Sequence, residues 1–415
     1  MAKEIKLRCP KCGDASAPRA SFHCPSCGCV LEVNVSIGHL TDADFSRMRQ
    51  SRDRSIWRWY DFFPAENPSS IVSLGEGDTP LIHAARLGEK IGIANLYLKN
   101  DTVLPTGSLK DRSNSVGFSV ARELRFGTAA VMSTGNAAAS VAAYAAAAGM
   151  KSVVLVPKGT ATAKIIQARA YGAAVIVVVG DFDREVAMLY KIAVQEFGWY
   201  DCLSSNPYRV GKKSYAYELV DQFDGVIPDW VIHPTAGGTG IFCMWQGFQE
   251  FRSLGWIDRV PKLVAAQSAA AAPFVIAMEK ASAEIQPVIA QETVAESIQV
   301  GNPAALGWRV LAALRESNGT AVALSDDEIL DAQAQTARLA GIFAEPAAAT
   351  SVAAAKKMRA AGTIKTNDVV VCNLTGHGLK QPEAIQVPEK EFAPIAPTLA
   401  ALREQIRKLA DISAP

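Results

Sequence analysis

One lysine in this chain stands where a side-chain amine could do covalent chemistry. Lys110 lies in the segment Pro105-Thr106-Gly107-Ser108-Leu109-Lys110-Asp111-Arg112, where a turn is expected to run into a helix. A lysine amine forms a Schiff base with an aldehyde, provided that burial or nearby positive charge lowers its pKa and leaves the amine neutral. A lone lysine is more often a solvated surface residue. Other segments must decide between these two interpretations.

Three further turns follow strand-like apolar runs. Ser133-Thr134-Gly135-Asn136 follows the run 129–132, residues 235–240 read Thr-Ala-Gly-Gly-Thr-Gly, and Thr375-Gly376-His377-Gly378 follows the run 368–374. Backbone amides at glycine-rich turns and helix N-termini can hold an anion. Such turns are also common structural features, so the indication of a binding site comes from finding all of them in one chain with the lysine segment.

Two Cys-x-x-Cys-Gly motifs lie near the N-terminus, Cys9-Pro10-Lys11-Cys12-Gly13 and Cys24-Pro25-Ser26-Cys27-Gly28. This spacing brings four thiolates to one tetrahedral zinc ion, and such a site has no open coordination position. We therefore predict a structural zinc ribbon with Cys9, Cys12, Cys24 and Cys27 as ligands. A redox dithiol is the alternative, although one motif would suffice for it. Cys29 and His23 are possible substitute ligands, against the symmetry of the two motifs.

The chain resembles the fold-type II pyridoxal-phosphate enzymes, and within them the threonine synthase family, from about Trp57 to Lys380. The resemblance implies an α/β fold like that of tryptophan synthase β, with two domains of parallel sheets and the cofactor between them, in addition to the N-terminal zinc ribbon. The motifs that carry it are Leu74-Gly75-Glu76-Gly77-Asp78-Thr79-Pro80-Leu81, Pro105 to Arg112, Ser133 to Asn136, Asn206-Pro207-Tyr208-Arg209, Phe343-Ala344-Glu345-Pro346 and Leu374 to Leu379.

The resemblance also implies residue roles. Lys110 would form the Schiff base with pyridoxal 5'-phosphate, Asn136 would bond to the ring hydroxyl, and Thr375 would face the pyridine nitrogen. A hydroxyl at that nitrogen makes the cofactor a weaker electron sink, which suits elimination and replacement better than transamination. The implied site comprises Lys110 as catalytic residue, Asn136, Gly237, Gly238, Thr239, Gly240 and Thr375 for the cofactor, and Ser133, Thr134 and Arg209 for the substrate.

The implied reaction is γ-elimination of phosphate from O-phosphohomoserine and β-addition of water, which gives threonine, with Lys110 taking the α proton. The chain departs from the family at Ala137, usually threonine, and at Leu203, usually asparagine. The family uses these positions to hold the substrate's phosphate, and the glycine loop here also lacks the family's asparagines. An alternative is therefore β-elimination or β-replacement on serine, threonine or O-phosphoserine, as in dehydratases or cysteate synthase. A further hypothesis is an inactive relative that acts by binding.

Composition fits a soluble metabolic enzyme. The 415 residues are 49% hydrophobic and 20% charged, and a formal net charge of +1 gives no indication of a nucleic-acid partner. The N-terminus has no apolar signal core, and no apolar run is long enough to span a membrane. We expect a cytoplasmic homo-oligomer, a dimer by default, that acts on a small amino acid. Cys202, Cys243 and Cys372 are expected in the core.

Strand and helix patterns alternate from residue 95 onward. The apolar runs 152–156 and 174–179 are typical of parallel strands covered on both faces, with helices at 161–171 and 183–197. The aromatic cluster around Trp57 is expected to pack on the body of the protein. We predict a zinc ribbon at 1–35, a large α/β domain at 36–113 and 211–385, a small α/β domain at 114–210, and a connector with an amphipathic helix, residues 398–409, at 386–415.

Overall fold

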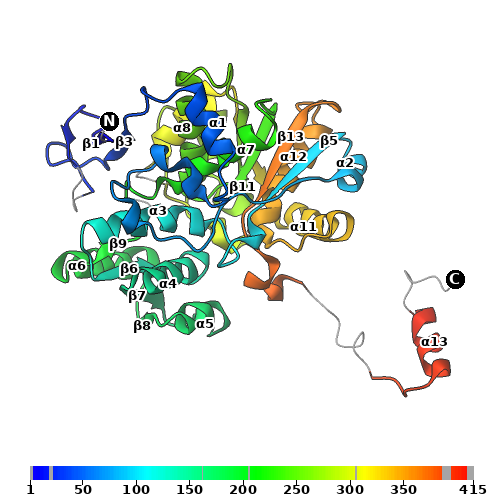
Figure 1. The fold of residues 1–415 in the computed structure, drawn as a ribbon. Helices are drawn as coiled ribbons and strands as arrows, with labels where there is room; N and C mark the ends of the chain where they lie inside the picture. Colours follow the sequence, from blue (N-terminus) through cyan, green and yellow to red (C-terminus); the bar gives the residue numbers. More distant parts are fainter. Residues whose placement is uncertain are drawn as a thin grey trace. The chain divides into compact units, whose positions relative to one another are not determined.

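A computed structural model describes residues 3–17, 22–160, 162–203, 206–303, 306–385 and 394–408. The chain divides into two units, Met1–Gln381 and Pro382–Pro415. The first unit holds three sheets and the helices that cover them (Figure 1). Among the described helices, none is both long and apolar enough to cross a lipid bilayer.

Within the described residues, the largest sheet has six strands in the order β12-β11-β10-β13-β5-β4. β4 is antiparallel to β5, and the other pairs are parallel. The central strands β10 and β13 are almost wholly buried, as expected for parallel strands covered on both faces. The strands are β4 (Leu81–His83), β5 (Asn95–Asn100), β10 (Trp230–Pro234), β11 (Lys262–Ser268), β12 (Thr320–Leu324) and β13 (Val369–Leu374).

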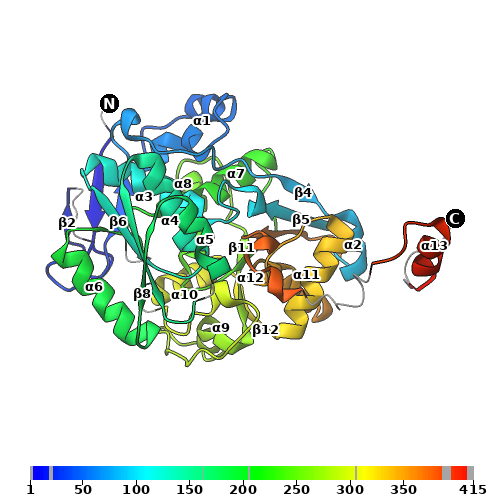
Figure 2. The same cartoon turned by 90° about the horizontal axis from the view of Figure 1, so that it is seen from below.

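Helices cover both faces of this sheet. The alanines of α12 (Pro346–Ala360) are buried against it on one side, with α2 (Ala85–Ile91) and α11 (Asp326–Ala340) alongside (Figure 2). A capping box of Ser325 and Glu328 starts α11. The other helices of this part are α7 (Ser214–Gln222), α8 (Thr239–Ser253), α9 (Pro273–Glu279) and α10 (Gly307–Glu316).

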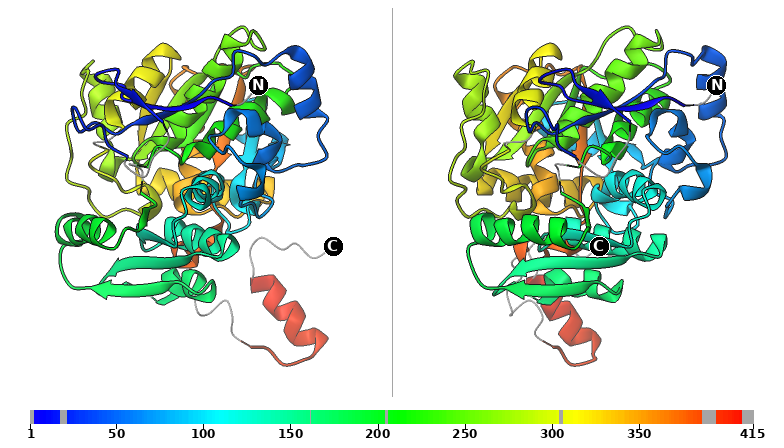
Figure 3. Two further views of the ribbon diagram at one scale, coloured as in Figure 1. Left: turned by 60° about the vertical axis from the view of Figure 1, so that its left-hand side comes forward. Right: turned by 90° about the vertical axis from the view of Figure 1, so that its left-hand side faces the viewer.

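A smaller parallel sheet, in the order β8-β7-β6-β9, forms a separate layer (Figure 3). On one face of this sheet the core includes residues of α3 and α4. On the other face it includes Tyr190 of α6 and Val186, which directly precedes α6. The elements are α3 (Lys110–Glu123), β6 (Thr128–Met132), α4 (Asn136–Ala148), β7 (Lys151–Pro157), α5 (Thr162–Ala170), β8 (Ala174–Val178), α6 (Ala187–Glu196) and β9 (Tyr200–Asp201). The prediction of an α/β fold with parallel sheets is confirmed.

The expectation that both apolar runs are covered on two faces is wrong for β8. Ile176 is 45% exposed and Val177 is 58% exposed, whereas the side chains of β7 are mostly buried. β8 is an edge strand, and its hydrogen-bonded neighbour in the sheet is β7. A continuous apolar run has the same appearance in an edge strand and in a central strand, because periodicity does not report sheet position.

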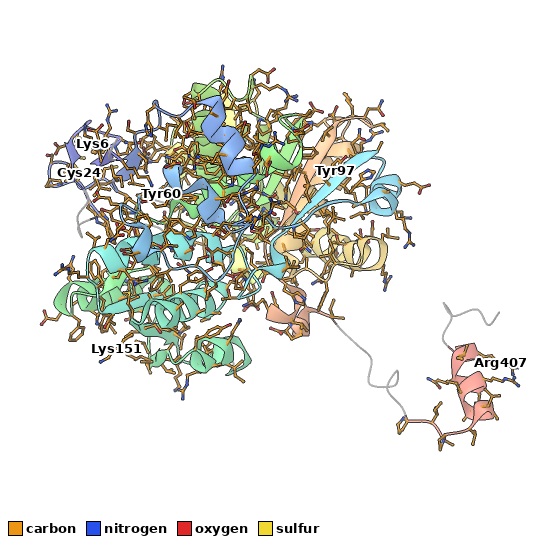
Figure 4. The ribbon with its side chains drawn as sticks, in the orientation of Figure 1. Lys6, Cys24, Tyr60, Tyr97, Lys151 and Arg407 are labelled. Atoms are coloured by element: carbon orange, nitrogen blue, oxygen red, sulfur yellow. The ribbon has the colours of Figure 1, made fainter. Side chains whose placement is uncertain are left out.

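The N-terminal segment forms a small antiparallel sheet of β1 (Ile5–Arg8), β2 (Ala15–Ser16) and β3 (Glu32–Val35). Figure 4 labels Lys6 of β1, and Cys24 of the same segment. Helix α1 (Asp42–Arg49) and the 3-10 segment Ile56–Phe62 follow. Trp57 is buried, and its Nε1 donates a hydrogen bond to Ser115 Oγ at 2.7 Å. The prediction that this aromatic segment packs on the body is confirmed.

In the second unit, the predicted C-terminal helix is present as α13 (Leu399–Lys408). Leu409, which the sequence also assigned to this helix, and residues 386–393 of the connector lie outside the described residues.

Candidate active site

Lys110 is the first residue of α3, at the end of a turn that is fixed by backbone hydrogen bonds. Leu109 N donates to Thr375 O, and His377 N donates to Gly107 O, both at 2.9 Å. Gly107 has φ +78°, which a residue with a side chain adopts reluctantly. The turn that carries the lysine and the turn after β13 are therefore held side by side.

Asp111 fixes the same turn through its side chain. Its carboxylate accepts hydrogen bonds from Thr106 N at 2.7 Å, Thr106 Oγ1 at 2.6 Å and Ser140 Oγ at 2.6 Å. Burial raises the pKa of Asp111 to about 6. These bonds join the lysine turn to α4, which carries Asn136.

Arg112 anchors α3 in a buried ionic cluster. Its guanidinium donates two hydrogen bonds to Asp101, both at 2.8 Å, and also bonds to Glu218. Lys99 Nζ lies 2.6 Å from Glu218 Oε2. Two cations and two carboxylates therefore balance each other within a fully buried cluster, which joins β5, α3 and α7 beneath the lysine.

In the glycine loop between β10 and α8, close packing requires two of the glycines, and a third faces open space. At Gly238, with φ +88°, an added Cβ would lie 2.4 Å from Val310 Cγ2, and at Gly240 it would lie 1.9 Å from His233 Nε2. At Gly237 it would meet nothing within 4 Å. The first amides of a helix have no intrahelical partner, so the start of α8 offers N–H groups to a negative charge.

Asn136, the first residue of α4, faces a buried carboxylate. Its Nδ2 donates to both carboxylate oxygens of Glu345, at 3.0 and 2.9 Å. Ser297 Oγ also donates to Glu345 at 3.0 Å. Burial raises the pKa of Glu345. The sequence motif included Glu345, but sequence reasoning gave it no role.

All ten residues that the sequence assigned to catalysis, cofactor and substrate line one cavity of about 1270 Å³. Ala137 and Leu203, where the chain departs from the family it resembles, line the same cavity. Phe22, His23 and Val30 of the N-terminal segment also contribute to its wall, which sequence reasoning did not anticipate. The structure thus brings the predicted residues together, and their individual roles remain predictions.

Lys110 has the properties of a reactive amine. Burial, together with the positive charge of Arg209, lowers its pKa to about 8, against the opposing effect of Glu345. Within the described residues, the Lys110 side chain forms no hydrogen bond or ion pair. Near neutral pH an appreciable fraction of the protein molecules therefore carry Lys110 as a neutral, nucleophilic amine, whereas a surface lysine is almost fully charged.

Two further cavity residues with titratable side chains, Lys212 and His233, were not predicted from the sequence. Lys212 is buried and follows Arg209 by three residues, a spacing that could have indicated a shared face. His233 is buried beneath Gly240, and its Nδ1 lies 3.0 Å from Asn373 Nδ2. Burial and the nearby charge of Lys212 lower the pKa of His233 well below its usual value, so His233 is neutral.

The four N-terminal cysteines form a cluster that could hold a metal ion. Their Sγ atoms all lie within 4.8 Å of one another, and none is in a disulfide. Cys9 Sγ is 3.4 Å from Cys27 Sγ, and Cys12 Sγ is 3.6 Å from Cys24 Sγ. These separations fit four sulfurs at about 2.3 Å from one tetrahedral ion. Cys29 and His23 do not belong to the cluster.

Contacts with the body fix the cysteine segment beside the cavity. Arg309 of α10 donates to Val30 O at 2.6 Å and pairs with Glu32 at 3.1 Å. The Phe22 ring packs edge-to-face on Tyr200 at 5.9 Å and on Tyr208 at 6.0 Å. The segment therefore contacts both the large-sheet helices and the small-sheet region.

The remaining cysteines Cys202, Cys243 and Cys372 are buried, as predicted. Burial raises the pKa of Cys202 to about 12 and that of Cys243 to about 11. Thiols of such high pKa are poor nucleophiles at neutral pH.

Comparison with known proteins agrees with these features. Residues 72–376 match the family described as "Pyridoxal-phosphate dependent enzyme". The chain is 39% identical to the threonine synthase of Methanocaldococcus jannaschii, over 97% of this chain and 99% of that protein. It is 38% identical to the threonine synthase of Methanosarcina acetivorans, over 96% and 98%.

Solved structures show the same fold at lower identity. The processed form of threonine deaminase isoform 2 from Solanum lycopersicum matches with a TM-score of 0.64 at 19% identity, over 83% of this chain and 90% of that one. Maize serine racemase matches with a TM-score of 0.62 at 20% identity, over 80% and 92%. The predicted fold-type II architecture is thereby confirmed.

Proposed function

Since the chain belongs to the threonine synthase family of pyridoxal-phosphate dependent enzymes, we propose that it releases phosphate from O-phosphohomoserine and adds water to give threonine. The observation that carries this proposal is the single cavity in which Lys110, without a bonding partner among the described residues, meets the glycine loop, Asn136 and Thr375. The alternative of β-elimination or β-replacement is not favoured, because the relatives that span nearly the whole chain are threonine synthases.

The cavity residues fit pyridoxal phosphate. Lys110 offers an amine for its aldehyde, and the amides at Gly237 to Gly240 offer donors for its phosphate, in a loop where an added side chain at Gly237 would project into open space. Asn136 and Thr375 offer an amide and a hydroxyl for the two polar positions of the ring. When bound, the cofactor withdraws electrons from the α carbon of the attached amino acid.

Lys110 then has two tasks that its environment supports. Its neutral amine would hold the cofactor through the aldehyde, and the same Nζ, when free, would accept the proton from the substrate's α carbon. A pKa near 8 suits both tasks at the pH of a cell, since a base works best when its pKa lies near the operating pH.

The substrate's carboxylate is assigned to the turn of Ser133 and Thr134, and its phosphate to Arg209. Arg209 Nη1 donates to the carbonyl of Cys202, and its Nε is buried without a partner among the described groups. A guanidinium with a free donor is well suited to an oxyanion.

We further propose that Cys9, Cys12, Cys24 and Cys27 bind one structural zinc ion. The near-tetrahedral sulfur separations and the matching turns at Gly13 and Gly28, both with positive φ, support this assignment. The two α/β domains, divided near residues 113 and 210, are also proposed, since the smaller sheet lies wholly between Thr128 and Asp201.

A homodimer remains a proposal, supported by the exposed apolar side chains Met188, Leu189 and Ile192 on α6. A cytoplasmic location remains an expectation from the sequence.

The test is a reaction of the purified holoenzyme with O-phosphohomoserine, with phosphate and threonine measured separately. Equal amounts of both products are expected, and Lys110→Ala should abolish them while the protein stays folded. Phosphate release without threonine, or release of a keto acid from threonine at a faster rate, would overturn the proposal.

A further inference from the structure

Arg209 and Lys212 share one face of a short turn. Arg209 directly precedes the 3-10 turn Val210–Lys213 and Lys212 lies within it, and because such a turn has about three residues per turn, side chains three positions apart project in the same direction. The turn lies against α3, because an added Cβ at Gly211 would be 1.7 Å from Arg112 O. Both Arg209 and Lys212 line the cavity together with Lys110.

Lys212 differs from the other buried lysines in its lack of a partner. In the described part of the chain three lysines are buried, and two of them form ion pairs: Lys99 with Glu218 at 2.6 Å and Lys213 with Glu250 at 2.6 Å. Lys212 is 7% exposed, and its side chain forms no hydrogen bond or ion pair with a described residue. A buried lysine without a counter-charge is costly to ionise, so Lys212, which lines the cavity, is well placed for an anionic ligand that supplies the opposite charge.

The charges around Lys212 also favour an anionic ligand. Burial and the positive charges of Lys110 and Arg209 lower the pKa of Lys212 well below its usual value. A bound anion would raise that pKa again and hold Lys212 in its charged form, beside the side chains of Lys110 and Arg209 that line the same cavity. The cofactor's phosphate is not the expected anion at Lys212, because we assign that phosphate to the backbone amides at the start of α8.

Two side chains of the same cavity cannot bind an anion by hydrogen bonds. Ala137 and Leu203 line the cavity and carry no hydrogen-bonding side-chain group. The phosphate group of a substrate would therefore have few hydrogen-bond donors here unless another residue provides them.

We propose that Lys212 binds the substrate's γ-phosphate beside Arg209, in a cavity where Ala137 and Leu203 offer no donor. This inference rests on the proposed function for its substrate. Lys212 is then a specificity-determining residue that distinguishes phosphorylated from free hydroxy-amino acids.

The test compares holoenzyme carrying Lys212→Gln, which removes the charge, with Lys212→Arg, which keeps it. Lys151→Gln is the matched control, because Lys151 is exposed at the start of β7 (Figure 4). The measurements are KM for O-phosphohomoserine, inhibition by inorganic phosphate, affinity for threonine from the change in cofactor absorbance, and affinity for pyridoxal phosphate.

For Lys212→Gln we expect KM and the inhibition constant of phosphate to rise about 10- to 100-fold, the loss of one charged hydrogen bond. Threonine and cofactor affinities should stay within about twofold, Lys212→Arg should recover most of the phosphate affinity, and Lys151→Gln should match the parent protein. Unchanged phosphate inhibition in Lys212→Gln, or a loss confined to cofactor affinity, would overturn the inference. A parent protein that binds phosphate through Lys212 but does not turn over O-phosphohomoserine would instead overturn the proposed function.

Discussion

Loss of the metal from the N-terminal cysteine cluster should alter the active-site cavity. The perturbation is Cys24→Ser, which removes one of the four thiolates. Structural zinc contributes about 10–16 kcal/mol to the folding of small zinc domains. That exceeds what a small sheet of short strands can supply by itself, so the segment should lose its structure without the metal.

The cost to the body can be worked from the contacts of Phe22, which is 7% exposed. Its burial contributes about 1.5–3 kcal/mol, and its edge-to-face contacts with Tyr200 and Tyr208 add about 0.5–1.5 kcal/mol each. We expect the free energy of unfolding to fall by about 2.5–6 kcal/mol. Since Phe22, His23 and Val30 line the cavity, KM should rise as well, whereas cofactor affinity should not change.

The assay combines zinc content, urea unfolding, trypsin cleavage after Arg8 and Lys11, and KM for the substrate. The matched control is Cys29→Ser, because Cys29 lies in the same segment but outside the cluster. The control should keep one zinc per chain and its parent stability. If Cys24→Ser kept its zinc, the four-thiolate assignment would be wrong. If it lost zinc with stability and KM unchanged, the segment would not form part of the cavity wall.

The remaining predictions concern the lysine, its buried support and the glycine loop. The rate at which the cofactor-free protein binds pyridoxal phosphate should rise about tenfold per pH unit up to about 8 and then level off, since the neutral amine of Lys110 is the nucleophile; a flat profile would contradict this. Glu218→Gln should cost about 3–5 kcal/mol in urea unfolding because it leaves two buried cations facing one carboxylate, against less than about 1 kcal/mol for the exposed Glu328→Gln; equal losses would argue against the buried cluster. Gly240→Ala should lower the free energy of unfolding by about 1–3 kcal/mol, because the added methyl group clashes with the His233 imidazole. Gly237→Ala should keep that stability and weaken cofactor binding, and a larger loss of stability for Gly237→Ala than for Gly240→Ala would contradict the placement of the two glycines.

Several features could be predicted from the sequence because each depends on a few consecutive residues. The cysteine motifs indicate a metal cluster through their own spacing, and the four thiols do lie together. The turns around Lys110 and Thr375 follow strands of the six-stranded sheet, and the turn at Asn136 follows a strand of the smaller sheet, so each lies beyond the carboxyl end of a parallel strand. The family resemblance then predicted that these turns meet in one site, and all three line one cavity.

Other features depend on which side chain from a distant segment of the chain contacts a residue. A lysine that pairs with a carboxylate and one that does not have the same local sequence, so neither Lys212 nor the pairing of Lys213 could be foreseen. The edge position of β8 was missed for the same reason.

The sequence by itself therefore determined the α/β class, the metal motif and the set of residues that meet around Lys110. The tertiary structure decided which cavity cation lacks a partner, that His233 occupies the space beside Gly240, and that the N-terminal segment forms part of the wall through Phe22. The physical reason is that backbone propensity and motif spacing act over a few residues, whereas burial and charge balance arise from side chains that meet across distant segments of the chain.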